Sequence, residues 1–369
     1  MNASSTKSAP TAATGPASLI ATLFPGYFAL VMATGVIAIA ARQQEINWLA
    51  DALFAVTLVA YGVLVGLSAA RALRYPRLLV ADLTSHARGF SFLTTVAATT
   101  VLGSSAAIIH QWWGFAWGLW VAGIALWLVL TYTAIIGDIF RDPKPPLGDG
   151  INGTWFLLTV STESVAVLGA LLLTRTGANQ ALELVTLGTF SLGIVLYLIV
   201  VTLLFLRWTF QPLRPTEVEP PTWIAAGAVA ITVLAGSNLL AVQHVSPRLE
   251  RLAPFLEGMV ILAWGTSTFW FPVMIAIGVW RHLVRRVPLR YHPAYWSLVF
   301  PIGMYGASTH GMIATTEFDA IDVVPQIALG AALVAWTLTS IGLLVSVTPR
   351  RSTSKPNTVV DDTGRRNRE

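Results

Sequence analysis

Residues 115–137 read FAWGLWVAGIALWLVLTYTAIIG, a stretch that contains no charged side chain. A helix of roughly 20 residues crosses the ~30 Å hydrocarbon core of a bilayer, so this stretch is long enough to span a membrane. Lipid offers the backbone no hydrogen-bond partner, and a continuous apolar run of this length is therefore predicted to be helical. The stretch predicts a transmembrane helix rather than part of a soluble domain.

Nine further apolar stretches lie on either side of this one, with charged loops between them. The ten predicted spans are Pro25–Ala41, Leu49–Ala72, Phe90–Ile109, Phe115–Gly137, Asn152–Thr174, Glu183–Phe205, Thr222–Ala241, Ala253–Trp280, Ala294–Ala314 and Val324–Val345. We therefore predict an all-α polytopic membrane protein, with ten transmembrane helices as five hairpins within residues 18–347. Residues 1–17 and 348–369 are low in complexity or polar, and they are predicted to be disordered tails.

The composition agrees with this fold class and excludes several others. Hydrophobic residues make up 55% of the chain, charged residues only 11%, and the mean hydropathy is +0.67, which does not describe a soluble domain. The absence of cysteine excludes a disulfide framework and a thiolate nucleophile. The pI near 9.7 is read as a topology signal, so we expect lipid rather than nucleic acid as a partner.

The lysines and arginines predict the orientation in the membrane. Of the 23 basic residues, nineteen fall in one set of alternate connections and tails, and four (Arg42, Arg175, Arg248 and Arg251) fall in the other. Basic residues accumulate on the cytoplasmic side of membrane proteins. We therefore expect a multi-pass plasma (inner) membrane protein with both termini in the cytoplasm.

The odd-numbered and even-numbered spans differ in the kinds of side chain that they contain, which we call their texture. The third span reads FSFLTTVAATTVLGSSAAII, and small and hydroxyl side chains dominate the odd spans, whereas seven tryptophans lie in the even spans against three in the odd. One interpretation is an inner ring of five helices that line a path, surrounded by five returning helices. The other is that small residues only allow helices to pack closely in lipid. Texture alone leaves both open.

Three motifs lie at the starts of predicted spans. The first span reads FPGYFALVMATGVIAIAA from Phe24 to Ala41, Asn152–Trp155 reads NGTW, and Tyr295–Pro301 reads YWSLVFP. Together they resemble the tellurite-resistance/dicarboxylate transporter family, which includes the plant slow anion channels. The resemblance covers roughly Phe24 to Val345. It implies a five-hairpin barrel around a central pore, a homotrimer with one pore per subunit, and a phenylalanine that plugs the pore. The matching residue in the W-x-x-x-F-P pattern is Phe300.

The odd helices would present their amino ends, and the positive ends of their dipoles, to the cytoplasmic mouth. Several weak hydrogen-bond donors spread along a pore suit the conduction of an anion better than one fixed cation inside it. The predicted anion path comprises Phe28, Thr95, Thr99, Thr159, Glu163, Thr232 and Pro301, with Arg285, Arg286 and Arg290 at the cytoplasmic mouth. For any single threonine, the alternative is a hydrogen bond to its own helix.

Glu163 is the ionisable residue nearest the middle of a predicted pore helix. A charge at the bilayer centre is costly, so this side chain is expected to be neutral, paired or facing water. It would serve either as a protonation site that couples protons to anion movement or as an anion-repelling control element. The structural alternative is a neutral carboxyl that is hydrogen-bonded between helices.

Two classes of function follow. The first is transport of small anions, such as a C4-dicarboxylate, sulfite, a tellurite-related oxyanion, chloride or nitrate, most simply as export through a phenylalanine-gated pore, with a proton-coupled carrier as the alternative. The second is a polytopic membrane enzyme, which is disfavoured because the sequence contains no clustered intramembrane catalytic set. Paired intramembrane histidines for haem are also lacking, and we expect no cofactor and no metal site.

Overall fold

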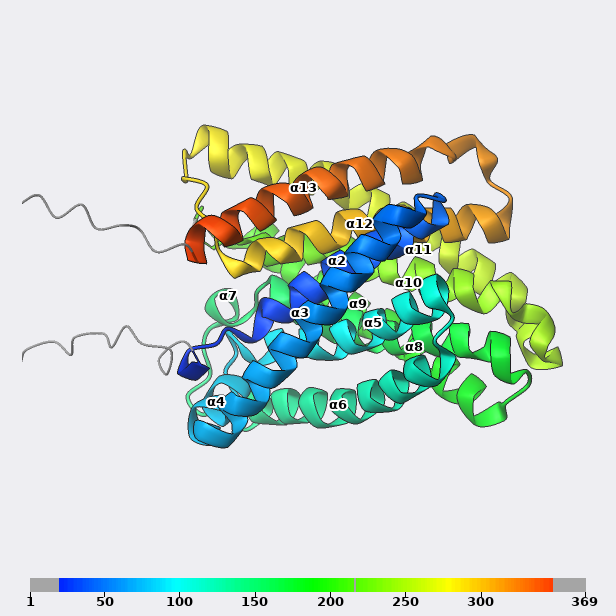
Figure 1. Cartoon of the computed structure of the whole chain (residues 1–369). Coiled ribbons are helices and arrows are strands. Elements are labelled where there is room, and N and C mark those ends of the chain that lie inside the picture. Colours follow the sequence, from blue (N-terminus) through cyan, green and yellow to red (C-terminus); the bar gives the residue numbers. More distant parts are fainter. Residues whose placement is uncertain (1–19, 216, 348–369) are drawn as a thin grey trace, which may run out of the picture.

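The computed structural model describes residues 20–215 and 217–347, and every regular element in these residues is a helix (Figure 1). Nine of the described helices are long and apolar enough to cross a membrane. The prediction of an all-α polytopic membrane protein is confirmed. Helix α12 (Trp296–Thr316) is long enough but less apolar, so the count of ten crossings stays a prediction. The predicted tails, 1–17 and 348–369, lie outside the described residues.

Five helices form the inside of the molecule. They are α2 (Phe28–Gln43), α5 (Leu93–His110), α8 (Leu157–Thr176), α10 (Ile224–Ala241) and α12. Each contacts the next in this order, and α12 contacts α2, so the five close into a ring. Small residues allow the close approach. A Cβ atom added at Gly227 of α10, for example, would lie 2.8 Å from Cγ of Pro301 on α12.

A longer helix returns along the outside after each inner helix. The outer helices are α3 (Asn47–Arg74), α6 (Trp113–Ile139), α9 (Gln180–Phe210), α11 (Pro247–Val279, continued by the π-turn η6, Trp280–Val284) and α13 (Val323–Val347). Each packs on the inner helix that precedes it (Figure 1). In the four inner helices that are long and apolar enough to cross a membrane, 83 to 94% of the apolar segment is buried, against 17 to 33% in the outer helices. This division favours the ring interpretation of the two textures.

Aromatic side chains of the outer helices hydrogen-bond to the inner helix of the following hairpin, and the pattern repeats five times. The bonds are Tyr61 Oη to Thr99 Oγ1 (2.9 Å), Trp127 Nε1 to Thr162 Oγ1 (2.8 Å), Tyr197 Oη to the Ala225 carbonyl (3.3 Å), Trp264 Nε1 to Thr309 Oγ1 (3.1 Å) and Trp336 Nε1 to Thr34 Oγ1 (3.0 Å). A buried Trp or Tyr needs such a partner. Tryptophans and tyrosines of the outer helices therefore join neighbouring hairpins, in four of the five cases through a threonine of the inner helix.

Each inner helix begins with a short 3-10 turn on the same end of the bundle, which we call the amino-end face. The turns are η1 (Pro25–Tyr27), η2 (Gly89–Phe92), η3 (Gly153–Phe156), η4 (Pro220–Trp223) and η7 (Pro293–Tyr295). Prolines start three of them, where a missing N–H costs nothing. The described chain also begins and ends on this face (Figure 1).

Arginines at the ends of outer helices hold the segments that lead into these turns. Arg71 donates to the carbonyls of Ala21 and Leu23, at 3.2 and 3.0 Å. Arg207 donates to the carbonyl of Gly148 at 2.8 Å, and Arg281 donates to that of Val218. Charge counting treats these residues only as topology signals, whereas the structure also uses them to fix the amino-end face.

Two smaller helices and two turns complete the described chain: α4 (Pro76–Leu83) and α7 (Leu147–Gly150) lie in loops of the amino-end face, and η5 (Gln243–Val245) and η8 (Asp319–Ile321) lie in loops at the opposite end.

Candidate functional site

A polar cavity of about 350 Å³ lies on the amino-end face, and we call it the vestibule. Its lining comes from all five hairpins and includes Phe24, Ser91, Asn152–Thr154, Pro221, Thr222, His292 and Ala294. The five 3-10 turns contact one another in a closed ring around this point. The amino ends of the inner helices, with the positive ends of their dipoles, therefore converge on one cavity, as the sequence predicts.

Side chains at the start of two inner helices already occupy some of the free backbone donors. Asn152 Oδ1 accepts from the N–H of Thr154 at 2.9 Å, and Nδ1 of His292 accepts from the N–H of Ala294 at 3.2 Å. In contrast, the buried hydroxyl of Ser91 has no hydrogen-bond partner among the described residues. The vestibule thus offers an unsatisfied hydroxyl and helix dipoles to an anion, rather than a row of free N–H groups.

The charged side chains of the vestibule differ from the predicted ones. The buried Arg207 lines it and pairs with Glu217, with Nη2 and Oε2 3.0 Å apart, and Asp149 and Glu219 line it as well. A hydrogen bond from the backbone N–H of Arg214, with a further contribution from Arg207, holds the pKa of Glu217 below its usual range. The vestibule is therefore of mixed charge rather than uniformly basic.

Arg285, Arg286 and Arg290, the predicted mouth residues, are exposed and are not part of the vestibule lining. The guanidinium of Arg285 lies over the ring of Trp280, 5.4 Å from its centroid. These arginines follow the end of α11 and belong to the surface of the amino-end face. Arg207 was not among the predicted site residues, because one arginine at the end of a long apolar span is indistinguishable from a topology signal.

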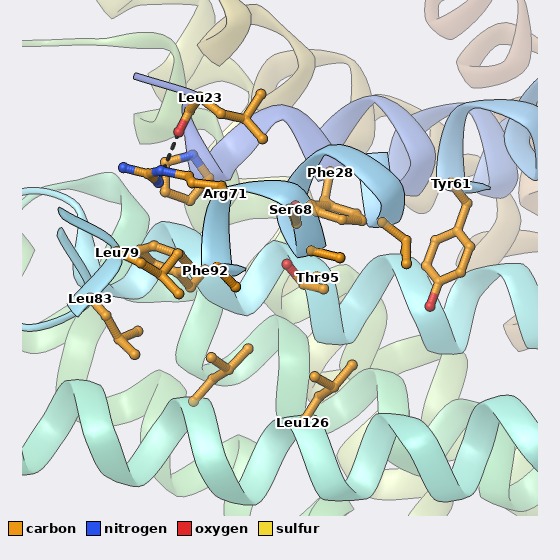
Figure 2. Close-up of a pocket in the computed structure, with 15 residues that line it drawn as sticks. Leu23, Phe28, Tyr61, Ser68, Arg71, Leu79, Leu83, Phe92, Thr95 and Leu126 are labelled. Atoms are coloured by element: carbon orange, nitrogen blue, oxygen red, sulfur yellow. Dashed lines mark hydrogen bonds between the residues drawn. The ribbon is translucent and has the colours of Figure 1, made fainter. Parts of the chain in front are cut away.

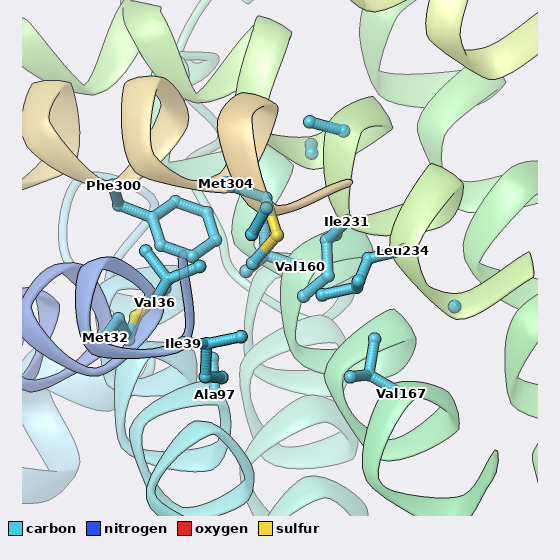
Figure 3. Close-up of a cluster of buried hydrophobic side chains, with 14 of the residues drawn as sticks. Met32, Val36, Ile39, Ala97, Val160, Val167, Ile231, Leu234, Phe300 and Met304 are labelled. Atoms are coloured by element: carbon cyan, nitrogen blue, oxygen red, sulfur yellow. The ribbon is translucent and has the colours of Figure 1, made fainter. Parts of the chain in front are cut away.

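Bulky apolar side chains fill the ring axis beyond the vestibule, and we call them the axial cluster (Figure 3). They surround a void of only about 10 Å³, which is lined by Val36, Ile39, Val101, Ser104, Ser164, Val167, Ile231, Leu234 and Met304. Every inner helix contributes to this set. A void of this size is at the lower limit for one water molecule, and apolar walls keep such a space dry. The axis is therefore closed to ions in this conformation.

Phe300 lies one helical turn before Met304 and joins the same cluster, beside Met32 and Val36 (Figure 3). Its side chain is only 1% exposed. The neighbouring Pro301 does not share this position, because its ring packs on Gly227 of α10. The structure thus places the predicted plug residue among the side chains that close the axis, and places Pro301 between two inner helices.

The carboxyl group of Glu163 is held between helices and lines neither the vestibule nor the void in the axial cluster. Oε1 accepts a hydrogen bond from Thr232 of α10 at 3.0 Å, and the side chain is fully buried. A Cβ added at Gly193 of α9 would lie 2.4 Å from Oε1, so only glycine leaves room for this carboxyl. Oε2 has no hydrogen-bond partner among the described residues. The geometry matches the interhelical alternative for this residue.

The predicted threonines do not line a common path. Thr99 donates to its own helix at the Thr95 carbonyl (2.7 Å) and also contacts Tyr61. Thr232 is bonded to Glu163, and the buried hydroxyl of Thr159 lacks a partner in the described structure. Thr95 and Phe28 line a separate lateral cavity between α3 and α6. The one predicted path residue in the axial cluster is Phe300.

Several axial residues escaped the sequence analysis although a signal existed. Met32, Val36 and Ile39 are bulky residues spaced by four and three positions on a helix otherwise rich in alanine and glycine. This spacing places them on one helix face. The predicted path consisted mainly of polar side chains, whereas the axis is lined mainly by apolar ones. No group of three His, Asp or Glu side chains suited to a metal ion occurs in the described residues.

Comparison with known proteins identifies relatives over most of the chain. The model of a family described as voltage-dependent anion channel matches residues 22–344. An uncharacterized membrane protein of Mycobacterium tuberculosis is 34% identical over 149 residues, which are 40% of this chain and 75% of that protein. An uncharacterized transporter of Methanocaldococcus jannaschii is 26% identical over 309 residues, which are 81% and 87% of the two chains.

A sulfite efflux pump of Trichophyton rubrum is 21% identical over 317 residues, which are 79% of this chain and 82% of the pump. The family match and the names of these relatives support anion transport. They also confirm the resemblance that the motifs of the first, fifth and ninth predicted spans indicate. The chain belongs to the voltage-dependent anion channel family.

Proposed function

We propose that the protein exports small oxyanions along the axis of its inner ring. The observation that carries this proposal is that two different regions, one polar and one apolar, follow each other along one axis. The polar vestibule collects the amino ends of five helices, and the axial cluster closes the ring just beyond it. Helix amino ends favour anions over cations. A path that binds weakly before it is blocked suits a gated channel better than a storage or catalytic site.

The proposed gate is the axial cluster, with Phe300 as its largest member. An apolar constriction excludes ions because an ion cannot shed its hydration shell there without replacement. Opening requires the Phe300 ring to leave the axis or the inner helices to separate. Gly303 and Gly306 of α12 are closely packed against neighbouring helices. The Phe300 ring therefore gains space to move only if those helices shift.

Sulfite is the first substrate to test, because relatives that match about four fifths of this chain are named sulfite efflux pumps. C4-dicarboxylates, tellurite-related oxyanions, chloride and nitrate are the competing substrates. Export follows if the amino-end face is cytoplasmic, as the basic residues predict, because the vestibule would then collect anions from the cell interior. We also propose that the protein lies in the plasma membrane and acts as a transporter rather than an enzyme.

The deciding experiment is flux from proteoliposomes that hold the full-length protein. Vesicles loaded with sulfite, nitrate, chloride or succinate are diluted into anion-free buffer, and efflux is measured with and without a proton gradient. We expect sulfite efflux that needs no proton gradient and is faster than succinate efflux. Succinate efflux alone would make the dicarboxylate the substrate. Absence of efflux for every anion, in vesicles whose protein is shown to be folded, would contradict the proposal.

A proton-coupled carrier is the second candidate, and the unpartnered Oε2 of the buried Glu163 supports it. The variant Glu163→Gln keeps the size and the hydrogen bond with Thr232 but cannot exchange a proton. If Glu163 couples protons to transport, this variant loses the pH dependence of flux and the response to a proton gradient. A wild-type pH profile in Glu163→Gln would leave the simple channel, with Glu163 as a structural residue between α8, α9 and α10.

We also propose a homotrimer with one pore per subunit, as the family resemblance implies. Size-exclusion chromatography with light scattering in detergent measures the oligomer directly. A monomer with full transport activity would show that each ring works alone.

A further inference from the structure

A second cavity, of about 360 Å³, lies between outer helices α3 and α6, and its floor is formed by α2 and α5 (Figure 2). Its walls are almost entirely apolar and include Phe28, Tyr61, Leu79, Leu83, Leu126 and Leu130. It shares no lining residue with the vestibule or with the void in the axial cluster. Cavities of this size hold small ligands or parts of larger ones.

The cavity opens toward the surrounding bilayer rather than toward the ring axis. Val65, Ala69 and Ala72 of α3 line it and are exposed on the outside of the molecule. The facing residues of α6, Leu126 and Leu130, are half-buried. Because α3 and α6 are outer helices of a membrane protein, the molecules that meet this opening are lipids.

Arg71 closes one end of the cavity but is not available to a ligand. Its guanidinium donates to the carbonyl of Leu23 (Figure 2), to that of Ala21 and to Asp82, with the last pair 2.6 Å apart. Each of its three nitrogen atoms therefore already donates a hydrogen bond within the protein. An acidic headgroup would need other cations.

Those cations lie at the corner where α3 meets α4. Arg74 and Arg77 are exposed, and neither forms an ion pair within the described part of the chain. Helix α4 turns Leu79 and Leu83 into the cavity, while Leu78 and Val80 are 49% and 56% exposed. A short helix with apolar residues on several sides and arginines beside it is suited to the membrane interface. The apolar cavity thus lies next to two exposed arginines, an arrangement suited to the interface between the hydrocarbon core and the lipid headgroups.

We propose that an anionic phospholipid binds here, with one acyl chain in the cavity between α3 and α6 and its phosphate at Arg74 and Arg77. The acyl chain would contact Phe28 of α2 and Thr95 of α5, which are inner-ring helices. The bound lipid would therefore fill the space between the first two hairpins and stabilise their packing. The proposal is independent of which anion the protein transports.

The test uses the delipidated full-length protein in detergent, with phosphatidylglycerol or phosphatidylcholine of identical acyl chains added. We expect phosphatidylglycerol to raise the thermal unfolding temperature more than phosphatidylcholine does. The variant Ala69→Phe fills the cavity and should lose most of this increase. Its control, Ala55→Phe, carries the same change on an exposed position of the same helix that does not line the cavity.

The headgroup is tested by the double variant Arg74→Gln/Arg77→Gln. It should respond equally to the two lipids, whereas the control Arg285→Gln/Arg286→Gln, on the same face, should keep the preference for phosphatidylglycerol. A full lipid response in Ala69→Phe, or an unchanged preference in the Arg74/Arg77 variant, would overturn the proposal.

Photolabelling provides a readout that does not depend on the folding of a variant. Phosphatidylglycerol with a diazirine in its acyl chain should label wild-type peptides that contain Leu126 and Leu130. Labelling confined to other outer helices would contradict the proposed site. Absence of labelling here, together with loss of the oligomer in Ala69→Phe, would show instead that a second copy of the chain covers the cavity.

Discussion

The vestibule and the axial cluster are neighbours on one axis and are opposite in chemistry. The vestibule has about 350 Å³ of space, with Arg207, three acidic side chains and the amino ends of five helices. The axial cluster has a void of about 10 Å³ and mainly apolar walls. The same five helices build both regions, and the change occurs within a few turns of each helix.

This difference suggests a division of labour between the two regions. The vestibule would select by charge, and its buried cation, Arg207, is already paired with Glu217, so it is expected to hold an anion only weakly. The axial cluster does not discriminate among anions by hydrogen bonding, and it sets the barrier to all of them by excluding water. Changes in the cluster should therefore alter the rate most, and changes in the vestibule should alter the dependence on anion concentration and salt.

The largest effect is expected for Phe300→Ala. Removing the ring from a closed axis should raise anion flux at least about tenfold, equivalent to a barrier lowered by ~1.4 kcal/mol. The measurement is efflux from proteoliposomes at matched protein content. If Phe300 is only core packing, the variant leaves flux unchanged and loses roughly 3–5 kcal/mol of stability.

Phe156→Ala is the matched control for this substitution. Phe156 is equally buried, and its ring packs 5.7 Å from that of Tyr197, between an inner and an outer helix. We expect this variant to lose stability without a gain in flux. Equal gains in both variants would mean that general loosening opens the ring, and the axial cluster would lose its special role.

Arg207→Gln tests the vestibule. The substitution removes a buried cation and its bonds with Gly148 and Glu217, so stability should fall by roughly 1.5–3 kcal/mol. The apparent affinity for the anion should also fall, with a smaller effect on the maximal rate than Phe300→Ala produces. Concentration-dependent efflux measures both quantities. Arg207→Lys keeps the charge, so an equal loss of affinity in Gln and Lys variants would show that the role of Arg207 is purely structural.

Neutralising Arg285, Arg286 and Arg290 together should have a weaker effect that depends on salt. These side chains are exposed on the amino-end face, and they act on anions only through the long-range field. Such a field is screened within about 10 Å at 0.1 M salt. We expect reduced flux at low ionic strength and wild-type flux at high ionic strength. An equal reduction at both would indicate altered folding or topology.

The smallest effect is expected from Glu217→Gln and concerns pH. Hydrogen bonds hold the pKa of Glu217 below its usual range, so its ionised form stabilises the folded protein above the pKa of the unfolded chain. This contribution is lost as the pH falls through the pKa of the folded state. The variant should therefore unfold at a slightly lower temperature than wild type near neutral pH and at the same temperature in acid.

Glu219→Gln is the control for this prediction, because Glu219 lines the same vestibule without an ion pair in the described structure. A difference between Glu217→Gln and wild type that grows in acid would contradict the assignment of the stabilising form.

The fold and the family followed from the sequence, but most of the site did not. Apolar stretches predicted the membrane helices, their textures left a ring of inner helices as one of two interpretations, and the FPGYFALVMATG motif indicated the family that the comparison confirms. The motif singled out Phe300 as the plug residue, and its role as a gate stays a prediction. Thr95 and Phe28 line a lateral cavity instead. A residue on an inner helix can face the axis, a neighbouring inner helix or an outer helix, and composition does not distinguish these directions.

The sequence by itself determined the class and the family, because lipid imposes length and polarity on every span and motifs are local patterns in the chain. The small and hydroxyl residues of the odd spans left open which helices are buried. Only the tertiary structure decided what lies on the axis. Which side chains meet there depends on the rotation of five helices about their own axes, and this rotation is set by contacts between segments far apart in the chain. Trp336 with Thr34 and Gly227 with Pro301 are two such contacts.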